Sequence, residues 1–328
     1  MDKTERVRAA LRGEAVDRPP YGFWTHFPGT DLDPDRLAEA TARFAREFDL
    51  DFVKSMPNGL YCVEDWGCVC DYGEVAKGGV AKVVSYAITE PGNWGCLRRL
   101  DVTAGAFGRE LKHLKQVIDL VGDETPVLAT AFSPLTIAQK LSGGAHRAHM
   151  QTAPGLLKQG LEMITAVTVE FVHQALGLGC AGVFFATQEA SLDNMDEASY
   201  AAFGRPFDAP VLAAMAAGGW FNVLHMHGDN VMFDLLKDYD VSALNWHVGE
   251  TPPSIRDYRK GGGGKPIVGG LQRTHITNKN QEAVLADLRR TLDETGGRGI
   301  LISPACVIRH PVDSATLTAT AEAIKRLA

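Results

Sequence analysis

Several features are missing or scarce in this sequence of 328 residues, and each absence excludes a class of protein. No run approaches the ~18 apolar residues that a membrane span needs, so a membrane protein is not expected. The six cysteines are too sparse for a disulfide framework, which favours free thiols in a reducing cytosol. The net charge of −7 offers no basic surface for nucleic acid. The first residues, Met1 to Pro20, lack the apolar stretch of a signal peptide.

What the sequence does contain is a regular alternation of short apolar runs with longer helical stretches. This alternation predicts parallel strands joined by helical crossovers. The strand candidates are short runs rich in β-branched and aromatic residues, and they lie near Tyr21, Phe52, Val127, Val183, Val223, Leu244, Val268 and Leu301. Such a series favours an α/β fold of the (β/α)₈ TIM-barrel type. An open doubly wound sheet is the alternative, but no G-x-G-x-x-G follows any strand candidate.

The domain organisation is predicted to be simple. Residues 1–328 are expected to form one barrel domain, because the longest glycine tract, Gly261 to Gly264, is too short to separate two domains. The stretch 61–100 is rich in Gly, Val and Trp and has no helical period. We therefore expect it to form a small antiparallel insertion after the second strand.

Polar residues gather where the predicted strands end. In a barrel the chemistry lies at the carboxyl ends of the strands, which converge on one rim. The residues at these ends are polar or metal-binding types: Thr25, His26, Gln188, Glu189, His225, His227, Trp246, His247, Gln272, Arg273 and Cys306. We expect them to approach one another although they span most of the sequence.

The stretch "FNVLHMHGDN" places two histidines one residue apart at a strand end. Residues i and i+2 of a strand point to the same side, so His225 and His227 can face one metal ion while Met226 faces away. A catalytic zinc site uses three protein ligands, and Cys306 would supply the third. The pattern alone also fits histidines held by hydrogen bonds or used in acid–base chemistry, and a buried structural Cys306. Both interpretations are open at this point.

Four stretches together resemble the uroporphyrinogen decarboxylase superfamily, which also contains corrinoid-dependent methyltransferases that act on thiols. They are "ERVRAALRGEAVDRPPYGFW", "VLATAFSPLTIAQKLSGG", "LHMHGDN" and "GILISPACVI". The resemblance implies the same barrel. In the methyltransferase branch a His, a Cys two residues later and a late Cys bind zinc. This set carries over to His225, to His227 in place of the first Cys, and to Cys306.

The resemblance implies a cytosolic zinc-dependent methyltransferase that activates a small thiol for methyl transfer from a corrinoid. The string "NWHVGE" lacks the Asp-x-His-x-x-Gly form of a cobalamin-binding module, so a separate corrinoid protein would be the partner. Exchanging a thiolate for the neutral imidazole of His227 leaves a zinc ion the stronger Lewis acid and a bound thiolate less nucleophilic. The oligomeric state is open, a homodimer included.

Two other functions remain in view. The first is a decarboxylase or other lyase acting on a small carboxylate, although the loop "FWTHFPGTD" lacks the arginines with which uroporphyrinogen decarboxylases hold their substrate. The second is a catalytically silent chain that binds a corrinoid protein.

Three residues are candidates for catalysis beside the metal ligands. Arg273 could grip an anionic substrate group with its planar fork. His26 could move protons in a lyase reaction. Glu250 follows the sixth strand, where zinc barrels that activate thiols can use a Glu as a displaceable fourth ligand. A surface salt bridge or a loop hydrogen bond explains Arg273 and Glu250 equally well.

Four residues are candidates for contact with the substrate. Trp24 and Tyr61 would form an aromatic wall with His26 at the mouth of the barrel. Gln188 and His247 follow the fourth and sixth strand candidates, and His247 could replace Glu250 as a fourth ligand. Ordinary core packing is the alternative role for Trp24.

Overall fold

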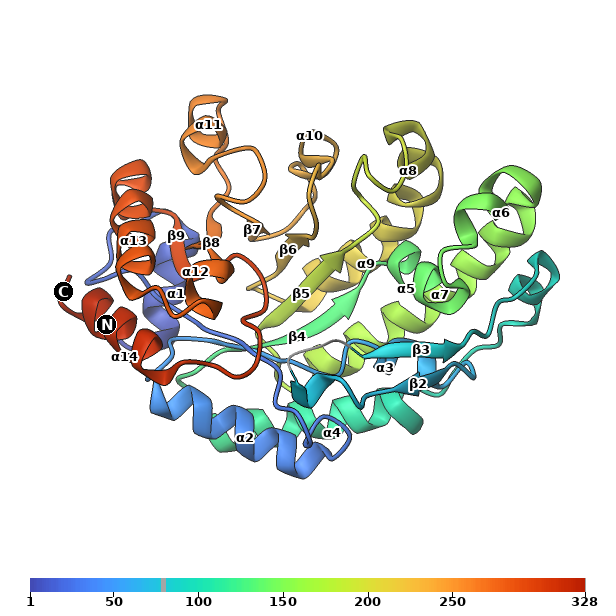
Figure 1. Ribbon diagram of the computed structural model, residues 1–328, viewed down its shortest axis with the longest axis horizontal. Coiled ribbons are helices and arrows are strands. Elements are labelled where there is room, and N and C mark those ends of the chain that lie inside the picture. The colour runs from blue at the N-terminus through green and yellow to red at the C-terminus, as the bar shows by residue number, and fades with distance from the viewer. Residues whose placement is uncertain (78–80, 328) are drawn as a thin grey trace.

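The computed structural model describes residues 1–77 and 81–327 as an α/β fold around a curled parallel sheet (Figure 1). The seven strands of this sheet follow one another in the order β1 (Val53–Lys54), β4 (Val127–Phe132), β5 (Gly182–Thr187), β6 (Val223–Met226), β7 (Ala243–Trp246), β8 (Ile267–Leu271) and β9 (Ile300–Pro304). All neighbouring pairs are parallel. A second, antiparallel sheet contains β2 (Val69–Asp71) and β3 (Lys82–Ser85).

Helices surround the parallel sheet, and both chain ends lie on the same side of the molecule (Figure 1). The α-helices are α1 (Lys3–Leu11), α2 (Pro34–Glu47), α3 (Tyr61–Glu64), α4 (Gly105–Val121), α5 (Pro134–Ser142), α6 (His146–Thr152), α7 (Pro154–Gly177), α8 (Glu197–Phe203), α9 (Arg205–Gly218), α10 (Phe233–Leu236), α11 (Ile255–Lys260), α12 (Arg273–Thr277), α13 (Gln281–Thr295) and α14 (Ser314–Lys325). Two 3₁₀ helices are η1 (Val75–Lys77) and η2 (Pro91–Cys96). Within the described ranges, no helix has both the length and the apolarity to cross a bilayer.

Local sequence signals start the helices that follow the strands. At α5 the Ser133 hydroxyl accepts a hydrogen bond from the Thr136 N–H, and Pro134 occupies the first helical turn, where its missing N–H costs nothing. Asp33 and Asp313 cap α2 and α14 in the same way. Ser133 directly follows β4, so its cap sets where α5 leaves the rim of the sheet.

Each strand of the parallel sheet divides its side chains between two apolar layers. Leu224 and Met226 of β6 pack with the large core between sheet and helices. Val223 belongs to a smaller core enclosed by the curled sheet. The other members of this inner core come from nearly every strand and from the first segments of the chain: Val7, Ala10, Trp24, Phe52, Met56, Leu128, Ala181, Phe184, Phe221, Ala243, Val268 and Leu301. Because strand side chains alternate, His225 shares the inner side with Val223.

The prediction of an α/β fold with parallel strands is confirmed, but the first predicted strand is not regular. Around Tyr21 the chain makes only isolated bridges, at Tyr21 and Thr25. Pro20 has no N–H to donate, so a continuous ladder cannot form there. The Ile302 N–H still donates to the Pro20 carbonyl at 2.8 Å, and the Asp51 N–H donates to the Tyr21 carbonyl at 2.9 Å. This segment therefore lies between β9 and the residues just before β1 and is hydrogen-bonded to both.

The predicted insertion at 61–100 is antiparallel in part. The strands β2 and β3 pair antiparallel, as expected, whereas α3, η1 and η2 make the rest of the segment helical. Residues 78–80 of the insertion lie outside the described ranges. The short helices were missed because each has one or two turns, too few to show a helical period.

One buried carboxylate ties the amino-terminal segment to the sheet. The Asp51 side chain is 0% exposed and accepts hydrogen bonds from the guanidinium groups of Arg6 at 2.7 Å and Arg18 at 2.6 Å. It also accepts the Tyr21 N–H at 2.9 Å. Both carboxylate oxygens are therefore satisfied, and the turn "DRPP" is held beside β1.

Replacing Asp51 is expected to destabilise the protein strongly. Asp51→Asn would leave the buried guanidinium of Arg18 without a counter-charge, which costs about 3–5 kcal/mol in comparable cases, while Arg6 would keep its ion pair with Asp17. Urea unfolding measures the change. The matched control is Asp49→Asn, at a half-exposed carboxylate paired with Lys3 and Lys325. Its left-handed backbone suits Asn, so a change below about 1 kcal/mol is expected. Equal effects of the two substitutions would contradict the importance of this network.

Candidate metal centre

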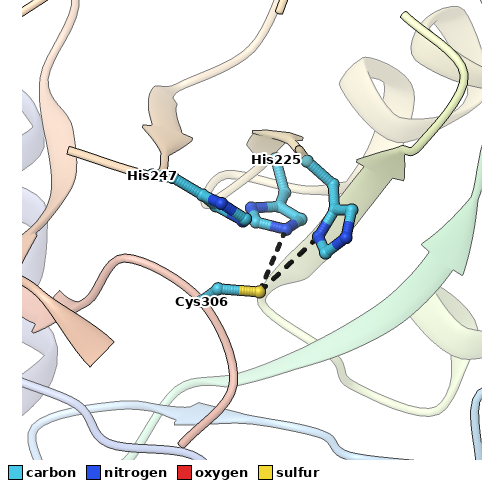
Figure 2. A group of neighbouring side chains, drawn as sticks. His225, His247 and Cys306 are labelled. Carbon is cyan, nitrogen blue, oxygen red and sulfur yellow. Dashed lines mark hydrogen bonds between the residues drawn. The ribbon is translucent and has the colours of Figure 1, made fainter. Parts of the chain in front are cut away.

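Four side chains from three strand ends converge at the rim of the sheet. His225 lies in β6, His227 directly follows it, His247 follows β7 and Cys306 follows β9. Each offers one ligand atom, and these atoms all lie within 4.8 Å of one another. The Cys306 sulfur is 3.8 Å from Nε2 of His225 and 3.6 Å from Nδ1 of His227. In Figure 2 the sulfur points toward the imidazole rings from the other side of the site.

The parallel register brings these residues together although 81 positions separate His225 from Cys306. His225 is paired with Asn245 across β6 and β7, so both point into the inner layer. His227 comes two residues later on the same side. Gly228 then turns the chain away with φ +105°, a conformation that side chains other than glycine rarely adopt.

Asn245 determines which nitrogen of His225 faces the cluster. The Asn245 amide donates through Nδ2 to the Val268 carbonyl at 2.6 Å, so its oxygen must be the atom that meets Nδ1 of His225. Nδ1 therefore carries the proton, and the lone pair of Nε2 points toward Cys306. Metal-binding histidines use such a partner to fix the tautomer and the ring orientation. The Phe184 ring stacks on His225 with centroids 5.1 Å apart and restricts the ring further.

Burial keeps the histidines of the cluster neutral. Burial is the main cause and the nearby Arg273 charge contributes to a pKa of about 4 for His227 and of about 3 for His247. The pKa of His225 is also well below its usual value because of burial. Neutral imidazoles are the form that binds a metal. Burial raises the pKa of the Cys306 thiol, which the Arg273 charge partly offsets.

The donor set fits a tetrahedral ion. Zinc–sulfur and zinc–nitrogen bonds of ~2.3 and ~2.05 Å at a tetrahedral angle place sulfur and nitrogen about 3.6 Å apart. The two sulfur–nitrogen distances in the structure are 3.6 and 3.8 Å. In addition, neither ring nitrogen of His247 has a hydrogen-bond partner within the described residues, although both are buried. Buried polar atoms are normally paired, so a ligand for His247 is expected.

A cavity of about 130 Å³ opens beside the cluster. His225, His227 and Cys306 form part of its wall. The remaining lining residues come mainly from strand ends and from the loops after them: Trp24, His26, Lys54, Met56, Pro57, Gly59, Thr130, Phe132, Lys140, Phe184, Ala186, Gln188 and Val307. Its volume is below the ~300–1,000 Å³ typical of pockets for drug-sized ligands, so it suits a small molecule.

The structure brings most of the predicted substrate residues to this cavity, with one exception. Trp24, His26 and Gln188 line it, and His247 adjoins it through the cluster. Tyr61, which the sequence suggested for the mouth, lies in the core instead. Its ring packs on Phe107, and its hydroxyl donates to the Thr130 carbonyl at 2.7 Å. The reason is that α3 turns this side chain inward, whereas an extended insertion had been predicted.

Arg273 and Glu250 lie beside the cluster and face each other. Nε of Arg273 is 3.5 Å from a carboxylate oxygen of Glu250, which is 3.9 Å from Nδ1 of His247. Neither residue lines the cavity. His247, and not Glu250, completes the group of four possible ligands.

Three residues of the site escaped the sequence analysis. Asn245 orients His225, and Lys54 and Lys140 bring positive charge to the cavity wall. A signal for the first two was present, because each is a polar side chain inside an otherwise apolar strand segment, "ALNW" and "DFVK". Lys140 lies on a helix of mixed polarity, where nothing in the pattern distinguishes it from a solvent-exposed lysine.

Comparison with known families decides the classification of the chain. The family model described as Uroporphyrinogen decarboxylase (URO-D) matches residues 2–327. The chain belongs to this family. The superfamily predicted from four short stretches is therefore confirmed.

Similar proteins lie on the methyltransferase side of the family, as the sequence analysis predicted. A protein named Methylcobamide:CoM methyltransferase MtbA from Methanosarcina acetivorans is 21% identical over 335 residues, which covers 98% of this chain and 97% of the relative. The protein of the same name from Methanosarcina mazei has the same identity and coverage.

Solved structures agree with the fold. A methyltransferase from Methanosarcina mazei superposes with a TM-score of 0.79 at 19% identity and covers 99% of both chains. A putative vitamin-B12 independent methionine synthase from Listeria monocytogenes has a TM-score of 0.54 at 13% identity, covering 90% of this chain and 84% of its own. At these identities the likeness establishes the fold alone.

The hydrogen bond from His225 to Asn245 predicts a measurable effect on metal affinity. Asn245→Leu removes the acceptor and is expected to weaken zinc binding about 10–100-fold. Asn245→Asp keeps an acceptor at the same place and is expected to retain the affinity. Competition with a chromogenic chelator measures both variants. Equal affinities of Asn245→Leu and the wild type would refute the orienting role of Asn245.

Proposed function

We propose that this chain is a zinc-dependent methyltransferase that transfers a methyl group from a methylated corrinoid to a small thiol. The observation that carries the proposal is the group of His225, His227, His247 and Cys306 at the wall of a small cavity. The two full-length relatives named Methylcobamide:CoM methyltransferase add support, because their names state a corrinoid methyl donor and a thiol acceptor.

The chain's own residues suit this chemistry. His225, His227 and Cys306 would hold the zinc ion, and His247 is the fourth donor within reach. A bound zinc ion lowers the pKa of a thiol, which then reacts as a thiolate near neutral pH. Asn245 and Phe184 hold the ring of His225 in place, so the ligand set is organised before the substrate enters.

His227 distinguishes this candidate metal site from a site with two cysteine thiolates. With His227 in place of a thiolate, the protein ligands bring one negative charge fewer to the metal. The nearby guanidinium of Arg273 adds positive charge at the same place, but Glu250 pairs with it and limits that effect. We expect thiols bound here to ionise at lower pH and to be weaker nucleophiles than in a site with two thiolates.

The methyl donor would arrive on a separate protein. The cavity of about 130 Å³ is too small to enclose a corrin ring, so the corrinoid would approach from outside the rim. Trp24, His26 and Gln188 would contact the thiol from the cavity wall.

The lyase alternative has less support. It relied on Arg273 to hold a carboxylate, and Arg273 faces Glu250 and does not line the cavity. No arginine belongs to the described cavity wall, which also argues against uroporphyrinogen as the substrate.

Four further predictions accompany this proposal. The chain would form one domain, which a family match over residues 2–327 supports. The sheet would close as a barrel with the Tyr21 segment between β9 and β1, supported by the hydrogen bonds on both of its sides. A homodimer and a cytosolic location stay predictions from the sequence.

Zinc content and methyl transfer test the proposal together. The wild type is expected to contain about one zinc ion per chain and to demethylate methylcobalamin when a small thiol is added. Cys306→Ala is expected to lower zinc affinity and methyl transfer by more than about 100-fold, because loss of an indirect partner already costs 10–100-fold. Metal analysis and the absorption change of the corrinoid are the measurements.

Cys180→Ala is the matched control, since Cys180 is another free, buried cysteine and lies in the core between sheet and helices. It is expected to keep both zinc and activity. Unchanged zinc content in Cys306→Ala would remove the central claim. Turnover of a carboxylate without demethylation of the corrinoid would favour the lyase.

A further inference from the structure

His227 lies in the loop after β6, and its ring is held differently from that of His225. Among the described residues, no side chain outside the ligand group forms a hydrogen bond with the His227 ring, whereas Asn245 fixes the ring of His225. The hydrogen-bonding contact of the His227 ring is the sulfur of Cys306, which is itself a possible ligand. The place of His227 in the ligand group therefore depends on how the backbone of residues 227–232 is held.

The 227–232 loop is bound to the end of β5 and to the loop that follows it, residues 188–194. The two segments are joined by backbone hydrogen bonds of 2.9 to 3.0 Å, here with the N–H donor named first: His227 to Thr187, Leu192 to Asn230 and Met232 to Ala190. Within the described residues, every backbone–backbone hydrogen bond between the 227–232 loop and another segment goes to residues 187–192. The 188–194 loop therefore determines where the 227–232 loop lies.

An ion pair with α6 fixes the 188–194 loop in turn. The carboxylate of Glu189 is buried and accepts hydrogen bonds from Nε and Nη2 of Arg147 at 2.8 to 3.0 Å. Nε2 of His146 contacts the same carboxylate at 2.9 Å. Nη2 of Arg147 also donates to Oδ1 of Asn194 at 2.9 Å, so one guanidinium group holds the loop near both of its ends. A planar guanidinium that binds a carboxylate through two nitrogens restricts both its position and its orientation.

Gln188 connects this loop to the cavity beside the ligand group, whose wall it lines. Its N–H donates to Oγ1 of Thr136 at 2.9 Å, and its carbonyl accepts a hydrogen bond from Nδ2 of Asn194 at 3.1 Å. Thr136 belongs to α5 and Arg147 to α6. The 188–194 loop is therefore attached to two helices on one side and to the 227–232 loop on the other.

We propose that Arg147, Glu189 and Asn194 are positioning residues, which hold His227 in the ligand group by way of the 188–194 loop. None of the three belongs to the described ligand group or to the described cavity wall. The inference rests on the proposed function, because metal binding is the property that the position of His227 affects. Without the guanidinium of Arg147, the 188–194 loop would loosen and the backbone of His227 would loosen with it.

Hydrogen exchange of the metal-free protein tests this coupling directly. Arg147→Met removes the guanidinium at a side chain that is 39% exposed, so the fold is expected to survive. Peptides that cover 188–194 and 227–232 are expected to exchange about tenfold faster than in the wild type, because loss of charge-assisted hydrogen bonds makes local opening easier. Arg147→Lys keeps one charged donor and is expected to give an intermediate rate. Mass spectrometry of chelator-treated protein measures the exchange.

Arg290→Met is the matched control, because Arg290 makes the same kind of ion pair elsewhere on the rim. It pairs with the buried carboxylate of Asp287 at 2.7 Å, and its side chain is 41% exposed. Asp287 also contacts a histidine and accepts the Gln272 N–H at 2.9 Å, directly after β8. That segment contributes no residue to the described ligand group. Arg290→Met is therefore expected to leave exchange of 227–232 unchanged.

Metal binding is the second measurement, by competition with a chromogenic chelator. Arg147→Met and Glu189→Gln are expected to weaken zinc binding about three- to tenfold, which is less than the 10–100-fold typical of a residue hydrogen-bonded to a ligand. Arg290→Met is expected to bind zinc as the wild type does. The visible absorption of the cobalt(II)-substituted protein reports ligand geometry rather than stability. It is expected to change in Arg147→Met and Glu189→Gln and to stay unchanged in Arg290→Met.

The two measurements separate this inference from the proposed function. A wild type without zinc would refute the proposed function, while faster exchange of 227–232 in Arg147→Met would still support the positioning of His227. In a wild type that binds zinc, unchanged exchange or unchanged zinc affinity in both Arg147→Met and Glu189→Gln would overturn the inference alone. Equal losses of zinc affinity in Arg147→Met and Arg290→Met would also overturn it, because they would indicate a general loss of stability.

Discussion

The two-sided alternation of the strands is the constraint on which the rest of the structure depends. Each strand of the curled sheet must present one set of side chains to the helices and the other to the small inner core. In β6 this rule sends Leu224 and Met226 outward, and Val223 and His225 inward. A shift of one residue would exchange these sets, bury polar groups against helices and disperse the ligand group.

The inner core and the candidate metal centre are therefore successive layers of side chains on the same strands. Apolar residues fill the inside of the sheet up to Val223 and Ala243, and the next inward positions on the same strands are His225 and Asn245. Their hydrogen bond occurs where the packed layer ends and the cavity begins. A rigid apolar floor explains how a loop residue, Cys306, can meet the two histidines at the end of β6 at 3.6 to 3.8 Å.

The charged side chains that line the cavity beside the ligand group are positive. The ligand group has one thiol and three imidazoles, and the surrounding cavity adds lysines rather than carboxylates. Glu250 is an acidic residue beside this group, and Arg273 faces it. Such a setting favours anions and thiolates over cations and neutral bases.

The sequence by itself determined the parallel α/β architecture, the family and the inward pair of His225 and His227, because these depend on local periodicity and on short motifs. It could not place Tyr61, since a helix of four residues leaves no period to read. Only the tertiary structure decided that His247 joins the ligand group, that Asn245 orients His225, and that Lys54 and Lys140 share one cavity. These relations depend on the register between strands and on helix placement, and both result from packing between segments far apart in the chain.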